Sequence, residues 1–257
     1  MSFLKKTIKE AINIDKSLFR KIFFYSIMFS AAFFLIIQLF GAVSGFIFSK
    51  ITESSGAVSL ENIDSANLEG YSSQMYGFLF LFISNIIIFA AALAYTYSFF
   101  ENKIWNTIFG KKTDFKNTSR FLGLNIVMSV IFSIVLFVLF SLIAKFLYGI
   151  PKLGSIIFFS VLLFSVYLFF VGYWSFGKTH EVFRSLKNIY LVGIKRIDLT
   201  IFEMIFALVV AVLLNLILLL FSWLPETVYL VLTVIGLQVY FSWFRLYLTN
   251  ALKSVKL

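Results

Sequence analysis

The sequence predicts an all-α membrane protein with six transmembrane helices. Three observations predict this fold class: the composition, six long apolar segments, and the placement of lysine and arginine between those segments. Of 257 residues, 61% are hydrophobic and 13% are charged, whereas a soluble domain has about 45–50% apolar and about 25% charged residues. So few charged side chains cannot cover so much apolar surface in water, and the chain therefore requires lipid as its solvent.

Each of the six segments is long enough to cross about 30 Å of hydrocarbon, which takes about 20 residues of helix. Backbone N–H and C=O groups find no water at that depth, so each segment must satisfy its own hydrogen bonds and is expected to be helical. The segments are Ile22–Phe48, Met75–Phe100, Phe121–Tyr148, Leu153–Phe176, Leu199–Leu224 and Thr227–Thr249.

The basic residues between these segments predict the orientation of the chain. Of the 22 lysines and arginines, only Lys50, Lys145 and Lys152 fall on the side opposite the termini. Cytoplasmic loops are enriched in Lys and Arg. We therefore expect a multi-pass protein of the plasma membrane whose two termini lie in the cytoplasm. The net charge of +10 is thereby explained as a topology signal, and no nucleic-acid partner is expected.

The three outer connections differ in kind. Gly149–Lys152 and Leu224–Glu226 are tight turns in which Pro151 and Pro225 end one helix and start the next. The first connection, Ser49–Gln74, is long, acidic and rich in Ser, Gly and Asn. It is interpreted either as a mobile loop or as an outer surface that meets a partner.

A basic amphipathic stretch precedes each pair of apolar segments, which indicates three repeat units in a single membrane domain, at about 1–102, 103–178 and 179–257. Apolar residues recur at helical spacing from Leu4 to Ile22 and from Val182 to Ile197, with lysines and arginines between them. A helix with one apolar and one basic face lies in the membrane interface. Each unit is therefore predicted as an interfacial helix followed by a transmembrane hairpin.

The stretches Lys9–Ile22, Gly110–Arg120 and Arg184–Ile197 also carry a family resemblance. In this recurring pattern the chain resembles prokaryotic membrane proteins related to the membrane domain of glycerophosphoryl diester phosphodiesterase. The resemblance implies six membrane helices built from a repeated unit of basic amphipathic helix and apolar helix. No phosphodiesterase catalytic domain is present in the sequence, so the resemblance implies no enzymatic activity.

The sequence contains no recognisable motif for catalysis, a cofactor or a metal. The chain has no cysteine and one histidine, His180, which excludes thiolate chemistry and sites that need several histidines. No P-loop, dinucleotide-binding glycine motif or nucleophile elbow occurs in the sequence. No catalytic, cofactor-binding or metal-binding residues are therefore predicted.

Glu203 and Arg245 are predicted to form an ion pair between the fifth and sixth segments. Each lies 21 residues from Leu224, so both should reach the same depth, about 30 Å from the outer turn. A structural clasp between the two helices is the favoured interpretation, and a transport gate is the alternative.

Four amides occupy the apolar segments. Asparagine and glutamine in membrane helices commonly form hydrogen bonds between helices, which is the favoured interpretation here. A polar translocation path is the alternative, and it requires all four side chains to converge on one cavity. The predicted cluster consists of Gln38, Asn85, Asn215 and Gln238.

These patterns favour a non-enzymatic integral membrane protein, either an accessory component that binds other membrane proteins or one that interacts with lipid. The alternative is a transporter or channel for an uncharged or lipophilic small molecule. Lipids with anionic headgroups are the expected partners, because basic residues near a membrane surface attract them. The residues expected to face the headgroups are Lys5, Lys9, Lys16, Arg20, Lys21, Arg184, Lys187, Lys195 and Arg196.

Overall fold

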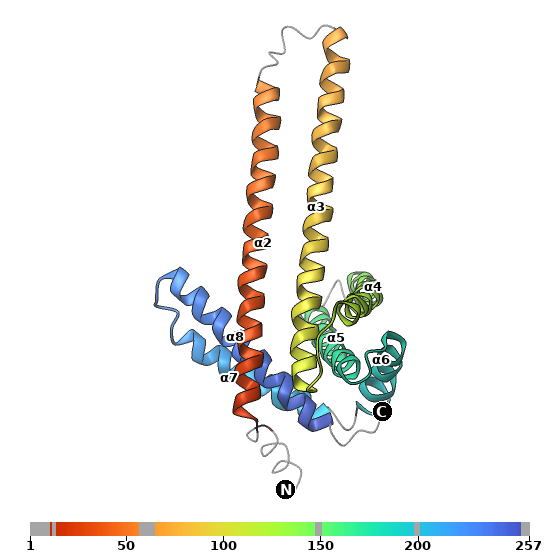
Figure 1. Ribbon diagram of the computed structural model, residues 1–257, viewed down its shortest axis with the longest axis vertical. Coiled ribbons are helices and arrows are strands. Elements are labelled where there is room, and N and C mark those ends of the chain that lie inside the picture. Colours follow the sequence, from red (N-terminus) through yellow and green to blue (C-terminus); the bar gives the residue numbers. More distant parts are fainter. Residues whose placement is uncertain (1–10, 12–13, 57–64, 147–150, 198–200, 253–257) are drawn as a thin grey trace. The chain divides into compact units, whose positions relative to one another are not determined.

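The computed structural model of the chain is helical and confirms the predicted fold class. It describes residues 11, 14–56, 65–146, 151–197 and 201–252, and no strand occurs among them. Figure 1 shows the helices along the chain. They are α2 (Lys16–Gly56), α3 (Ser65–Ile108), α4 (Phe115–Phe146), α5 (Pro151–Thr179), α6 (Val182–Asn188), the π-helical η2 (Ile189–Ile194), α7 (Ile201–Leu219) and α8 (Glu226–Ala251).

Six of these helices are long and apolar enough to cross a membrane, namely α2, α3, α4, α5, α7 and α8. They correspond one to one with the six predicted segments. Two of them are much longer than a membrane crossing requires. The 41 residues of α2 and the 44 residues of α3 span roughly 60 Å or more at about 1.5 Å per residue, about twice the thickness of the hydrocarbon.

Local sequence signals explain where several helices begin. Asp15 accepts hydrogen bonds from the backbone N–H groups of Ser17 and Leu18, at 2.8 and 3.2 Å, and so caps α2. Asp114 caps α4 in the same way, through a 2.6 Å bond from the N–H of Asn117. The turn before Asp114 depends on Gly110, whose φ of +65° is favourable for glycine.

The first outer connection is shorter than the sequence indicated. Ser49–Gln74 was predicted as a loop, but α2 continues to Gly56 and α3 begins at Ser65. The prediction ended each helix where its hydrophobicity ended. Because no proline interrupts the backbone hydrogen bonds there, each helix continues beyond its apolar span. Residues 57–64 lie outside the described part of the chain.

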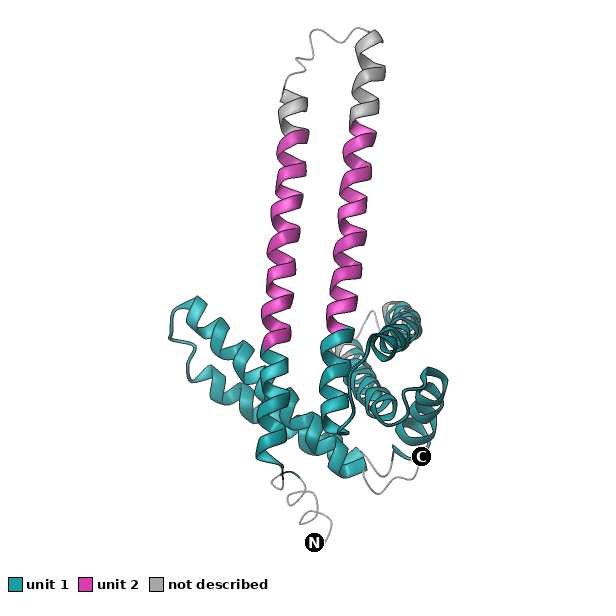
Figure 2. Cartoon of the chain, in the orientation of Figure 1, with its two compact units in different colours: residues 1–27, 98–257 teal, residues 28–97 magenta. Residues whose placement is uncertain are grey.

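The chain forms two compact units, shown in Figure 2. Unit 2 (Met28–Tyr97) contains most of α2 and α3, and unit 1 contains Met1–Ile27 and Ser98–Leu257. In unit 2, aromatic side chains bridge the two helices. The rings of Phe40 and Phe89 stack with centroids 4.1 Å apart, and Asn85 donates a 3.0 Å hydrogen bond to Ser44.

Helix α5 is the central helix of unit 1. In its most apolar stretch 61% of the residues are buried within the protein, and it packs against α4, α6 and η2. Glycines permit this close packing: a Cβ on Gly177 would lie 2.7 Å from the ring of Phe109, and one on Gly193 would lie 2.7 Å from Leu168. The same unit contains the largest buried side chains, Trp105 and Trp174.

The three predicted interfacial stretches differ in the structure that they form. In the first, residues 4–10, 12 and 13, which include Lys5 and Lys9, lie outside the described residues, and residues 16–22 form the beginning of the long helix α2. The middle one contributes Ile104 and Trp105, which are buried near the end of the continuous helix α3. The third forms α6 and η2, as two short consecutive helices. The three-unit repeat remains a prediction.

Candidate functional site

The ion pair between Glu101 and Arg245 is a deeply buried charge contact of unit 1. Glu101 lies near the end of α3 and Arg245 near the end of α8, and their exposed fractions are 5% and 6%. Nη2 of Arg245 donates to one carboxylate oxygen of Glu101, and Nε1 of Trp105 donates to the other at 3.2 Å. The contact therefore joins two helices that are 144 positions apart in the sequence.

This pairing corrects the predicted partner of Arg245, which was Glu203. Glu203 is buried at the matching depth, but its carboxylate accepts a hydrogen bond from the hydroxyl of Tyr247. Counting residues from the turn predicts depth along a helix and carries no information about rotation around it. Tyr247 is two positions from Arg245, so their side chains point about 200° apart around α8. One faces Glu203 of α7 and the other faces Glu101 of α3.

A layer of buried amides and hydroxyls continues from this ion pair. The Asn102 amide donates to Thr118 at 3.1 Å and thereby joins α3 to α4. The Asn106 amide donates to Asn102, also at 3.1 Å. Asn125 donates to Ser98 and Asn188 to Ser175, each at 2.8 Å, so that these bonds connect α3 to α4 and α5 to α6. None of these asparagines was predicted, because they lie at the edges of the apolar segments, where polar residues are ordinary.

The guanidinium of Arg245 retains unused donors. Its Nε and Nη1 atoms are buried and have no hydrogen-bond partner among the described residues. The ring of Phe170 lies beside it, with 5.7 Å between the ring centroid and Cζ, which provides a favourable cation–π contact. The arrangement is suited to holding α3, α5 and α8 together, since it joins a charge pair and an aromatic contact at one buried point.

The four predicted amides are found in both units. Gln38 and Asn85 belong to unit 2, and Asn85 forms the hydrogen bond to Ser44. Asn215 and Gln238 belong to α7 and α8 of unit 1, and Asn215 lines an apolar cavity there. Asn85 thus joins two helices, as expected of an interhelical amide. Convergence of all four amides on one path remains a prediction.

The described basic residues of the predicted headgroup set are exposed without exception. They are Lys16, Arg20, Lys21, Arg184, Lys187, Lys195 and Arg196. Lys16 and Arg20 also line a surface hollow together with Phe19 and Trp243, and the indole N–H of Trp243 donates to the carbonyl of Ala11 at 3.1 Å. A hollow that combines cationic and aromatic side chains is chemically suited to a lipid headgroup.

His180 connects α5 to α6 in an unusual backbone conformation. Its φ is +56°, and its N–H donates to the carbonyl of Phe176 at 2.7 Å. Desolvation by burial lowers the pKa of the imidazole below its usual 6.5; Lys111 lowers the pKa further, Asp114 acts in the opposite direction, and Arg120 lowers it again. The buried Nδ1 atom has no hydrogen-bond partner among the described residues. The site thus favours a neutral histidine.

No family model, curated protein or solved structure matches this chain. Within the described residues, no three His, Asp or Glu side chains gather in a way that could hold a metal ion.

The burial of Glu101 and Arg245 predicts strong energetic coupling between them. Replacing either residue alone with leucine leaves the other charge buried and unpaired, which costs about 3–5 kcal/mol. The double variant removes both charges and should cost much less than the sum of the single variants. The measurement is a double-mutant cycle on thermal unfolding in detergent.

The same cycle on Glu203 and Arg245 is the matched control. Because Glu203 bonds to Tyr247, its coupling to Arg245 should be much smaller than that of Glu101. Equal or larger coupling in the Glu203 cycle would restore the pairing predicted from the sequence and refute the assignment to Glu101.

The lowered pKa of His180 predicts loss of stability in mild acid. The unfolded chain binds the proton more tightly than the folded protein, so the contribution of His180 is complete above a pH of about 6.5 and declines as the pH falls below it. The thermal midpoint in detergent should therefore decrease between about pH 7 and pH 5. His180→Asn keeps a residue that tolerates positive φ and should flatten this dependence. An equal slope in both proteins would contradict the prediction.

Proposed function

We propose that this protein is a non-enzymatic, multi-pass plasma-membrane protein that interacts with lipid through a basic surface at the cytoplasmic face. The observation that carries the proposal is the side-chain arrangement of α6 and η2. Phe183, Tyr190 and Ile194 are 87%, 58% and 45% exposed. The charged side chains of Arg184 and Lys187 are exposed on α6, and that of Lys195 is exposed directly after η2. Water alone does not favour so many exposed apolar side chains on 13 residues.

Such a segment is suited to the boundary between headgroups and acyl chains. Its aromatic and aliphatic side chains can enter the acyl region, while lysine and arginine contact anionic headgroups. Each basic residue near the surface contributes about 1 kcal/mol to that attraction. The hollow beneath Trp243, with Lys16 and Arg20, supplies a second contact of the same chemistry at the beginning of α2.

Two further features support the proposal. The positive-inside distribution of lysine and arginine favours cytoplasmic termini. The resemblance to proteins related to the membrane domain of glycerophosphoryl diester phosphodiesterase favours a role within the membrane. An accessory role beside another membrane protein is the related alternative. Purification of the protein from native membranes, described below, also tests that role.

Removal of two interfacial charges should weaken the binding of anionic lipid. The double variant Arg184→Gln and Lys187→Gln loses about 2 kcal/mol of attraction, or roughly 30-fold in affinity for phosphatidylglycerol. Mass spectrometry of the intact protein, purified from native membranes and titrated with phosphatidylglycerol, measures this affinity. The loss should diminish at high salt, because salt screens exposed charges.

The matched control is Lys50→Gln with Lys145→Gln, which removes two charges from the predicted opposite side. Its affinity for phosphatidylglycerol should equal that of the wild type. Equal effects of the two double variants would contradict a specific basic face. A protein that co-purifies in stoichiometric amount, with no retained lipid, would instead establish the accessory role.

The proposed orientation is testable because the natural chain has no cysteine. Lys112→Cys introduces a thiol at the exposed turn before α4, and Ser222→Cys introduces one at the exposed turn between α7 and α8. In intact cells, a maleimide that cannot cross the membrane should label only the Ser222 variant, and both variants should react after the cells are opened. Labelling of the Lys112 variant in intact cells would reverse the proposed topology.

A further inference from the structure

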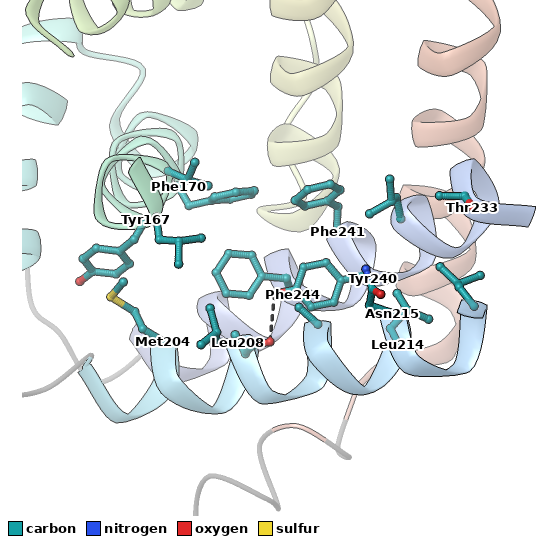
Figure 3. A pocket seen from close by; sticks show the side chains of 16 residues that line it. Tyr167, Phe170, Met204, Leu208, Leu214, Asn215, Thr233, Tyr240, Phe241 and Phe244 are labelled. Atoms are coloured by element: carbon teal, nitrogen blue, oxygen red, sulfur yellow. Dashed lines mark hydrogen bonds between the residues drawn. The ribbon is translucent and has the colours of Figure 1, made fainter. Parts of the chain in front are cut away.

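An elongated cavity of about 470 Å³ lies between α5, α7 and α8, all within unit 1. Its volume falls in the range of small-molecule sites, about 300–1,000 Å³. Figure 3 shows the lining side chains converging from the three helices. Apolar residues form nearly all of the lining, among them Tyr167 and Phe170 of α5 and Phe241 and Phe244 of α8.

The cavity follows one face of each helix in the α7–α8 hairpin. On α7 the lining residues include Met204, Leu208, Ala211 and Asn215, and on α8 they run from Thr233 to Phe244. Spacings of three and four residues place these side chains on a single helical face. The lining face of α7 extends over 14 residue steps, from Met204 to Leu218, and that of α8 over 11, or about 21 and about 16 Å at 1.5 Å per step. The cavity is therefore long enough for a chain-like molecule that lies parallel to the helices.

A few polar groups are spread along this cavity. Asn215 and Thr233 lie in the half nearer the α7–α8 turn, where the Thr233 hydroxyl already donates to the carbonyl of Tyr229 at 2.9 Å, and Met204 and Tyr167 lie at the other end (Figure 3). In the middle, the hydroxyl of Tyr240 already donates to the carbonyl of Ala207 at 3.1 Å. No charged residue lines the cavity. The lining is thus apolar apart from a few uncharged polar groups.

The Asn215 amide has hydrogen-bonding capacity available for a ligand. Among the described residues, none forms a hydrogen bond with it. The side chain lies in the membrane-spanning helix α7, where no water is at hand to satisfy an amide. An amide without a partner in an apolar medium is costly, by several kcal/mol. A molecule that places a carbonyl or hydroxyl at this end would remove that cost.

We infer that this cavity binds one acyl chain of an uncharged or zwitterionic membrane lipid, with the ester carbonyl of that chain accepting a hydrogen bond from Asn215. The chain then extends past Ala211 and Leu208 toward Met204. The absence of lining charges disfavours a fatty-acid carboxylate in the cavity, and the largely apolar lining disfavours a molecule that is polar throughout. The inference deepens the proposed lipid interaction and rests on it, because the occupant is a membrane lipid.

Photocrosslinking with a defined lipid tests this site. The probe is phosphatidylcholine with a diazirine at the end of one acyl chain, mixed into nanodiscs that contain the full-length protein. With its ester at Asn215, the probe should label residues at the far end of the cavity, in the peptides that contain Met204 and Tyr167. Peptide mapping by mass spectrometry locates the label.

Two variants challenge the site in different ways. Ala211→Phe fills the cavity with apolar volume and should lower labelling of the Met204 peptide at least fivefold. Asn215→Leu removes the polar contact at similar size and should lower labelling about fivefold to tenfold, as expected for one lost hydrogen bond. The matched control is Val212→Phe, since Val212 is the neighbouring residue, is 53% exposed and does not line the cavity.

The outcomes distinguish the site from lipid that merely surrounds the protein. Loss of labelling in Ala211→Phe but not in Val212→Phe supports the inference. Labelling that is equal in all variants, or that is spread over outward-facing residues, overturns it. Insensitivity to Asn215→Leu alone overturns the assigned orientation of the chain.

The phosphatidylglycerol titration on the same variants separates this inference from the proposed function. If the cavity is not labelled while phosphatidylglycerol still binds, only the acyl-chain site is refuted. If the cavity is labelled as expected while no anionic lipid binds, the basic-surface proposal is refuted and the site remains.

Discussion

The structure depends on apolar side chains that the protein itself does not cover. In the most apolar stretch of α3 no residue is buried within the protein, and in α4 only 6% are. Within the protein alone, side chains such as Phe80 and Phe137 are about 70% exposed. Hydrocarbon must therefore cover these surfaces. Helix association therefore gains little from the hydrophobic effect, and close packing together with polar contacts must hold the helices. Only α5, with 61% of its apolar stretch buried, has a core of the kind found in soluble proteins.

This constraint explains why polar residues are concentrated where the helices of unit 1 meet. The ion pair of Glu101 and Arg245, the Glu203–Tyr247 hydrogen bond and the asparagine contacts each join different helices. Apolar contact alone would allow a helix to rotate or slide against its neighbour at little cost. A buried charge pair permits one arrangement, because any other leaves a charge unpaired. These contacts are therefore best understood as determinants of specificity among helices whose surfaces are otherwise alike.

The sequence predicted the helices well and their contacts poorly, for a physical reason. Hydrophobic length predicts each membrane segment, and Pro151 and Pro225 indicate two of the turns between them. Depth along a helix can be predicted by counting residues, and Glu203 bonds to Tyr247, two positions from Arg245. Rotation around the helix does not follow, because α8 is apolar on most sides and shows no clear polar face. Glu101 was not predicted as a partner of Arg245, because a carboxylate just beyond an apolar segment is typical of a solvated helix end.

The sparse packing between helices also explains the shape of the cavity between α5, α7 and α8. At one end, Phe170 of α5 meets Phe244 of α8 edge to face, with centroids 4.9 Å apart, beside the guanidinium of Arg245. At the other end, the turn before Glu226 connects α7 to α8. Between these two points the small residues Ala207 and Ala211 leave the facing surfaces incompletely filled. Because contacts fix the helices at both ends of the cavity, the protein needs little rearrangement to accept a ligand. The free-energy cost of ordering side chains on binding is therefore small. Lipid acyl chains surround the protein at all times and can fill this cavity. A hydrogen bond from Asn215 would fix the position of one such chain.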